Sequence, residues 1–165
     1  MSESAAPWST TLHAILPHRF EPRALMLRGS TGWSLPYALL DRELWSADVR
    51  KVNAALGEAL AAPVTALRYV RFQPDDVARR TQAVYVVENH SPAWHPPGNA
   101  AWIGRAALAD LAPVRPDHRA LIDAVLAKSE SGQIPDLREP WARPGWFVTA
   151  AAWLLIAQRL GWVDA

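Results

Sequence analysis

The sequence predicts an α/β domain of the α+β kind, with helices added at its C-terminal end. Three observations lead to this prediction. Runs of β-forming residues lie both before and after one segment with helical spacing, and further helical patterns collect in the last third of the chain. A length of 165 residues is enough for one domain with a substantial core. This order of elements is typical of helices packed on a sheet.

The first part of the chain is predicted to be rich in strands. Residues 11–18 alternate well enough for a strand, and residues 24–28 form a second, apolar one. Residues 29–32, Gly-Ser-Thr-Gly, have the composition of a turn. Residues 33–36 begin an extended segment, which Pro36 confines to a sheet edge or an irregular stretch.

The next segment has the spacing of an amphipathic helix. Ser46 is predicted to cap this helix, which runs to about Leu60, with Asp48 in its first turn. The apolar stripe that should face the core consists of Val49, Val52, Leu56 and Leu60.

Two strands follow, over residues 64–72 and 81–88, with a turn at 73–76 between them. A proline-rich loop at 90–98 contains Trp94 and His95. A short strand at 101–103 and a short helix at 105–111 come after the loop.

Two helices are predicted in the last third of the chain. One runs from Pro116 to Lys128, and residues 129–144 then resemble a linker. The last helix, residues 145–160, is strongly apolar, and Trp146, Trp153 and Leu160 share one face. We expect a domain at 1–130, with the linker and C-terminal helix at 131–165 docked on it.

Composition excludes several classes of function. Seventeen basic and sixteen acidic residues give a net charge of +1, which does not favour nucleic-acid binding. The chain has no cysteine, and therefore no disulfide, zinc–thiolate site or thiol nucleophile. The first residues lack a signal-peptide pattern, and the most apolar run, 147–157, is shorter than a bilayer requires. We expect a cytoplasmic protein without membrane contact.

Four segments carry a first resemblance. Their order along the chain resembles that of the Nudix hydrolase family. The segments are Trp33-Ser34-Leu35-Pro36, the helix ending near Leu60, the strand at 64–68, and Ala-Trp-Ile-Gly-Arg at 101–105. The resemblance covers roughly residues 11–128. It implies a mixed sheet with flanking helices, and an activity that cleaves nucleoside diphosphate derivatives with magnesium or manganese held by glutamates.

The glutamates of the Nudix signature, G-x5-E-x7-R-E-U-x-E-E-x-G-U with U apolar, are missing from this sequence. With the first glycine at Ala38, Leu44 stands at the first glutamate and Leu56-Gly57 at the Glu-Glu pair. A register two residues further on recovers only Glu58, and one residue back recovers only Glu43. We therefore expect a non-catalytic domain, with no catalytic residues, no cofactor and no metal bound at residues 38–60.

A second resemblance lies in residues 84–91, 96–98, 101–104 and 140–147. These phrases resemble a bacterial protein type in which such a domain precedes an aminoglycoside-phosphotransferase-like kinase domain. The chain has no kinase catalytic loop and stops at Ala165, where that domain would begin. The resemblance implies a regulatory domain that positions a kinase-like partner.

These observations leave three hypotheses. In the first, the domain senses a small phosphate- or sugar-containing ligand, or regulates a partner, and its ligand-binding residues are Trp33, Arg68, Glu88, His90 and Trp94. In the second, it is a Nudix-type hydrolase whose metal acids have moved to Asp41, Glu43, Glu58 and Glu88. In the third, the nine tryptophans provide an interaction or dimerisation surface. Glu88, His90 and His95 also cluster in sequence, but not in a recognised zinc pattern.

Overall fold

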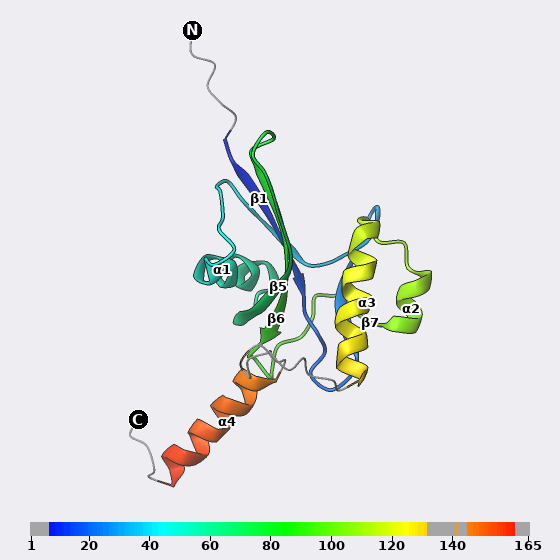
Figure 1. Cartoon of the computed structure of the whole chain (residues 1–165). Helices are drawn as coiled ribbons and strands as arrows, with labels where there is room; N and C mark the ends of the chain where they lie inside the picture. The colour runs from blue at the N-terminus through cyan, green and yellow to red at the C-terminus, as the bar shows by residue number, and fades with distance from the viewer. Residues whose placement is uncertain (1–6, 132–140, 142–144, 161–165) are drawn as a thin grey trace.

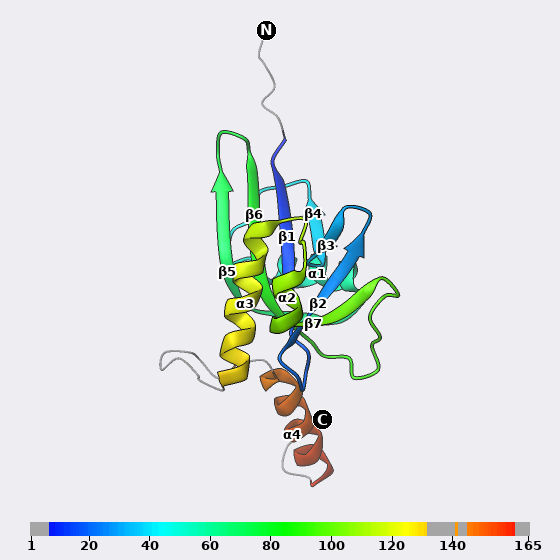
Figure 2. The same cartoon turned by 90° about the vertical axis from the view of Figure 1, so that its right-hand side faces the viewer.

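The computed structural model describes residues 7–131, 141 and 145–160. In this part of the chain the strands form two sheets with helices on both sides (Figures 1 and 2). The predicted α/β class with a mixed sheet and flanking helices is confirmed.

The larger sheet has four strands in the order β4-β1-β6-β5. Its members are β4 (Tyr37–Leu40), β1 (Ser9–Ile15), β6 (Arg80–Asn89) and β5 (Val64–Asp75). The two central strands, β1 and β6, are parallel, whereas β4 and β5 pair antiparallel to their neighbours. The parallel pair brings the C-terminal ends of β1 and β6 to the same edge of the sheet.

The smaller sheet is antiparallel, with the order β3-β2-β7. It consists of β3 (Gly32–Ser34), β2 (Arg23–Gly29) and β7 (Ala100–Gly104). The predicted turn at 29–32 joins β2 to β3 as expected, and Gly32 adopts a φ of +132°, which glycine tolerates best.

Helices cover both sides of the larger sheet. Helix α1 (Val49–Leu60) packs on one side, while α2 (Arg105–Asp110) and α3 (Pro116–Ser131) lie on the other (Figure 1). Two apolar clusters result: one joins Val52 and Leu56 of α1 to the sheet, and the other joins Ile122 and Leu126 of α3 to it. The sheet therefore has a core on each face.

Helix α1 differs from the prediction at its N-terminus. It begins after Asp48 rather than Ser46, and the Asp48 carboxylate accepts a hydrogen bond from Lys51 Nζ instead of capping the helix. Val49 is 40% exposed, because it stands at the first turn, where the chain enters from an exposed loop. Val52, Leu56 and Leu60 are buried as predicted, and Ala55 completes the stripe.

The hairpin of β5 and β6 is longer than predicted. The strands continue through residues 73–75, and the turn lies at 76–79, where Arg79 takes a φ of +48°. Register shifts at Ala66/Arg68 and Tyr69/Arg71 let the long strand β5 bend. Helix α3 includes residues 129–131, which were predicted as linker, and the linker residues 132–140 and 142–144 lie outside the described residues.

Helix α4 (Trp146–Arg159) confirms the predicted C-terminal helix but extends away from the sheets (Figure 1). Its first turn contacts the domain: Phe147 stacks on His90, and the Val148 amide donates to Glu88. None of its residues is buried, and Trp153 and Leu160, which were predicted to lie on the docked face, are 61% and 55% exposed. Among the described helices, none has the length and apolar character needed to cross a membrane.

Candidate functional site

The C-terminal end of α1 fixes how this helix corresponds to the Nudix signature. The last helical residue is Leu60, and Ala61 adopts a left-handed conformation with a φ of 49°. A glycine is the usual residue at this position, and the signature has its second glycine just after its helix. With Ala61 at that glycine, the Arg-Glu pair falls on Ala54 and Ala55, and the Glu-Glu pair on Glu58 and Ala59.

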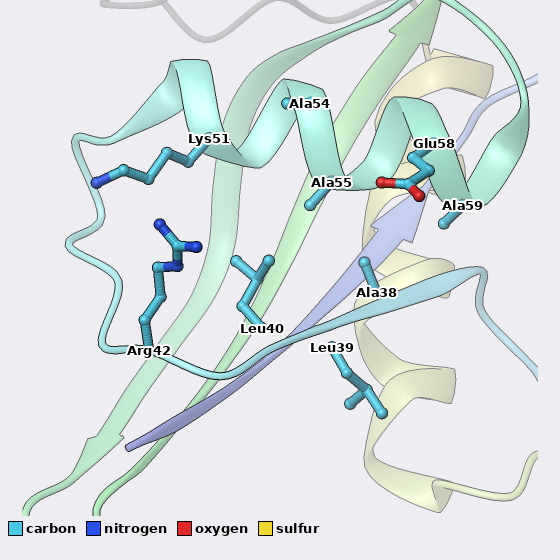
Figure 3. A pocket seen from close by; sticks show the side chains of 9 residues that line it. All are labelled: Ala38, Leu39, Leu40, Arg42, Lys51, Ala54, Ala55, Glu58 and Ala59. Carbon is cyan, nitrogen blue, oxygen red and sulfur yellow. The ribbon is translucent and has the colours of Figure 1, made fainter. Parts of the chain in front are cut away.

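The same four residues line a groove of about 490 Å³ between α1 and β4 (Figure 3). Arg42 and Lys51 lie together on one side of this α1 groove, and Glu58 lies on the other (Figure 3). The Lys51 ammonium holds the pKa of Asp48 below its usual value through a hydrogen bond. The α1 groove thus offers two cations and one carboxylate.

The carboxylates proposed for a displaced metal site are not brought together. Asp41 and Glu43 are exposed and do not line the α1 groove, and Glu88 lies in the wall of a different cavity. Within the described residues there is no group of three or more histidine or acidic side chains placed to hold a metal ion. His95, the third member of the Glu88–His90–His95 cluster, is exposed and does not line the second cavity either.

This second cavity, called here the aromatic cavity, has a volume of about 660 Å³. It lies at the edge of the larger sheet where the parallel strands β1 and β6 both end. The segment 16–20, which follows β1, forms one wall, and residues 87–92, at the end of β6 and just after it, form another. Trp94, Pro96, Trp102 of β7 and residues of α4 from Phe147 to Leu155 also line it. Its size is that of a small-molecule site.

Glu88 is the charged side chain most deeply set in this wall, with 7% of its surface exposed. Its Oε1 accepts a hydrogen bond from the backbone amide of Val148, at 3.4 Å, in the first turn of α4. Its Oε2 and Nε2 of His90 are buried, and neither has a hydrogen-bond partner among the residues that the structure describes. A buried carboxylate oxygen without a donor is costly, because burial strips away the water that would bind it.

Aromatic rings form part of the wall, and contacts hold several of them in place. Trp94 Nε1 donates to the carbonyl of Leu60 at 2.8 Å, which also satisfies a carbonyl at the end of α1. Trp102 meets His18 edge-on, with ring centroids 4.8 Å apart. His90 stacks on Phe147 with centroids 5.5 Å apart. Several of the rings that line the cavity are therefore held in place by contacts with their neighbours.

Three of the five predicted ligand-binding residues meet in this cavity. Glu88, His90 and Trp94 all line it. Trp33 and Arg68 line neither cavity. Trp33 lies on β3, where its backbone pairs with Ala112 and Val114, and Arg68 lies on β5 opposite Val86. The structure therefore separates these two residues from the other three.

Sequence reasoning missed the segment 16–20, Trp102 and Phe147 as cavity residues. The parallel pairing of β1 with β6, strands about 70 residues apart in sequence, brings the segment 16–20 to the cavity, whereas Trp102 comes from β7 and Phe147 from α4. A usable signal was the aromatic and histidine content that follows both strands, with His18 and Phe20 after β1 and His90 and Trp94 after β6.

A pair of buried histidines lies apart from both cavities. His13 of β1 and His118 of α3 have ring centroids 4.5 Å apart, and both are almost fully buried. Burial lowers the pKa of each to about 4, and the neighbouring Arg115 adds to this in both cases. Within the described part of the chain, neither ring nitrogen of His13 has a hydrogen-bond partner. Both imidazoles are thus held neutral between β1 and α3.

Comparison with solved structures defines the class of fold. The chain is similar to a NUDIX hydrolase from Nitrosomonas europaea, with a TM-score of 0.55 and 13% identity over 79% of this chain and 76% of that one. It is similar to an ADP-ribose pyrophosphatase from Streptococcus suis, with a TM-score of 0.52 and 18% identity over 77% and 96%. The fold is therefore Nudix-like.

A proposed oxidoreductase from Sinorhizobium meliloti matches with a TM-score of 0.56 and 18% identity over 79% of this chain. This chain spans only 41% of the length of that protein. The sequence matches no protein-family model and no curated protein. At such low identities the similarity establishes the fold alone.

Proposed function

We propose that the chain is a Nudix-fold binding domain that takes a small ligand in the aromatic cavity and lacks the metal-dependent hydrolysis of Nudix enzymes. One observation supports the proposed absence of hydrolysis: at the four signature positions on α1, only Glu58 is acidic. A single carboxylate leaves a hard divalent cation mostly hydrated and weakly held. The cavity around Glu88, with its fixed rings, supports the proposed binding of a small ligand.

Metal binding and hydrolysis give a direct test. We expect calorimetry with magnesium or manganese to show no specific site, and ADP-ribose and related nucleoside diphosphate derivatives to remain uncleaved. Ala59→Glu provides a matched gain-of-function variant, because it places a second carboxylate beside Glu58 on an exposed helix position. This variant should bind manganese more tightly than the parent protein.

The hydrolase alternative makes the opposite prediction. It draws on the similarity to structures named as a NUDIX hydrolase and an ADP-ribose pyrophosphatase. If it holds, the parent protein cleaves such a substrate with added metal, and Glu58→Gln, which removes the one carboxylate of the α1 groove, abolishes the cleavage. Metal-dependent cleavage by the parent protein that is lost in Glu58→Gln would overturn our proposal that the chain lacks hydrolase activity.

A regulatory role toward a kinase-like partner, or self-association, remains part of the proposal. The exposed apolar side chains of α4, with Trp153 and Leu154 at 61% and 57% exposure, support an interaction surface of the kind expected for the tryptophan-rich module. Light scattering over a concentration series tests self-association. A mass that stays monomeric at all concentrations would exclude the homodimer.

The phosphate- or sugar-containing ligand expected from the resemblance needs a place with suitable charge. A phosphate group requires cations, and the α1 groove supplies Arg42 and Lys51. The aromatic cavity instead presents the Glu88 carboxylate. The two cavities therefore favour ligands of opposite charge.

A further inference from the structure

We infer that the aromatic cavity selects a small organic cation, an ammonium group carried on an apolar or aromatic body. The inference rests on the proposed binding function and names the chemistry of its ligand. It combines three features of the described part of the cavity wall: a buried carboxylate with an oxygen that has no hydrogen-bond partner there, several aromatic rings held by contacts, and few cations.

The carboxylate of Glu88 decides the sign of the ligand's charge. Among the described residues, its Oε2 lies buried without a donor, and its Oε1 has the long contact to Val148. A buried carboxylate is stabilised most by a charge-assisted hydrogen bond, which an ammonium group donates. An anionic ligand would add a second negative charge to a site that already carries one.

The aromatic rings favour the same chemistry. Trp94, Trp102 and Phe147 line the cavity, and Trp94 and Trp102 are fixed by the contacts to Leu60 and His18. The face of a ring attracts a cation through its quadrupole, and it packs equally well against an apolar body. A ligand with both parts therefore uses the carboxylate and the rings together.

The other charged group in the wall does not cancel this preference. Arg19 is the single lysine or arginine among the lining residues of the described chain, and it is exposed, with its guanidinium 5.2 Å from the ring of Phe20. His18 and His90 are engaged by ring contacts with Trp102 and Phe147. Glu88 thus remains the buried charge that faces a ligand.

Glu88 also has a structural role to be separated from binding. Its contact with the Val148 amide places a carboxylate at the N-terminus of α4, a position that anions stabilise. If this were its whole role, its replacement would destabilise the protein without changing the affinity for a cation. The experiment therefore measures both affinity and thermal stability.

The test uses three probes of the same shape and different charge: phenethylamine, phenethyl alcohol and phenylacetate. Calorimetry at neutral pH should show that the amine binds and that the alcohol and the acid bind at least about ten-fold more weakly, as expected for loss of one charge-assisted contact. Glu88→Gln keeps the size of the side chain and should lower the amine affinity about ten-fold without affecting the alcohol. Glu58→Gln, in the α1 groove, is the matched control and should change nothing.

A second variant locates the site independently of the charge. Phe147→Leu removes one ring from the wall and should weaken binding of the amine and of any alcohol that binds. If the alcohol or the acid binds as tightly as the amine or more tightly, the preference for a cation is overturned. If Phe147→Leu then weakens the binding of the alcohol or the acid, the cavity still binds a ligand, and the proposed binding function stands. Absence of amine binding, or a Glu88→Gln variant that loses stability while keeping its amine affinity, would also overturn the inference. Metal-dependent cleavage of ADP-ribose would instead count against the proposed function.

Discussion

Mild acid should destabilise this domain through the buried pair His13 and His118. In the folded protein, burial lowers the pKa of each from 6.5 to about 4. The unfolded chain therefore takes up protons as the pH falls through 6.5, whereas the folded protein does not until about pH 4. Stability is fully present above the unfolded pKa and decreases as the pH falls from there toward 4.

The magnitude follows from the linkage relation. Between pH 7 and pH 5, each histidine with these two pKa values lowers the free energy of unfolding by about 2 kcal/mol. The pair thus accounts for at most about 4 kcal/mol, out of about 5–15 kcal/mol for a typical domain. Asp117, near His118, has its pKa lowered below the ordinary value of 3.8, so its protonation lies outside this pH window.

Urea unfolding followed by circular dichroism at pH 7 and pH 5 measures the effect. His13→Leu should fold at pH 7, because neither ring nitrogen of His13 makes a hydrogen bond with a described residue, and it should remove about half of the pH dependence. His95→Leu, at an exposed position, is the matched control and should leave the pH dependence of the stability unchanged. Equal stability of the parent protein at both pH values, or an unaltered dependence in His13→Leu, would refute the reasoning.

Two further predictions concern α1. Leu56→Asp places a charge at a fully buried position and should cost several kcal/mol, enough to unfold the domain or lower its melting temperature severely; a variant that melts like the parent would show that this face of α1 is not in the core. Ala61→Gly relieves the left-handed φ of 49° and should raise the free energy of unfolding by about 1 kcal/mol in urea titration. A loss of stability in Ala61→Gly would contradict the C-cap assigned here.

Sequence patterns predicted those parts of the fold that depend on local chemistry. The stripe of Val52, Leu56 and Leu60 has the helical period, and these residues are buried against the sheet. The start of α1 was predicted incorrectly because Ser46 and Asp48 are both good caps, and sequence alone does not rank them. Here Asp48 occupies the cap position, although its carboxylate pairs with Lys51.

The candidate site depended on contacts that sequence does not encode locally. All five ligand-binding residues were predicted from the loops expected to line a groove, and Glu88, His90 and Trp94 lie close together because they are at the end of β6 and in the loop that follows it. Trp102, Phe147 and the segment 16–20 reach the same cavity only through the parallel pairing of β1 and β6 and the placement of α4. Trp33 and Arg68 were grouped with the site from the expected order of elements, which does not specify where their strands lie in the sheets.

The two faces of α1 explain how this fold persists without the acidic positions of the Nudix signature. The inward face is constrained by packing, and Val52, Leu56 and Leu60 keep the apolar side chains that the core requires. Of the four signature positions, Ala54, Glu58 and Ala59 are exposed and make no demand on the core, whereas Ala55 is buried and packs in it. Alanine is the best helix former, and at position 55 it also avoids placing a carboxylate in the core, so alanines at these positions favour the folded helix. Most of the residues that stabilise the fold are thus different from those that would bind a metal ion. A Nudix-like fold by itself therefore does not establish hydrolysis in this chain.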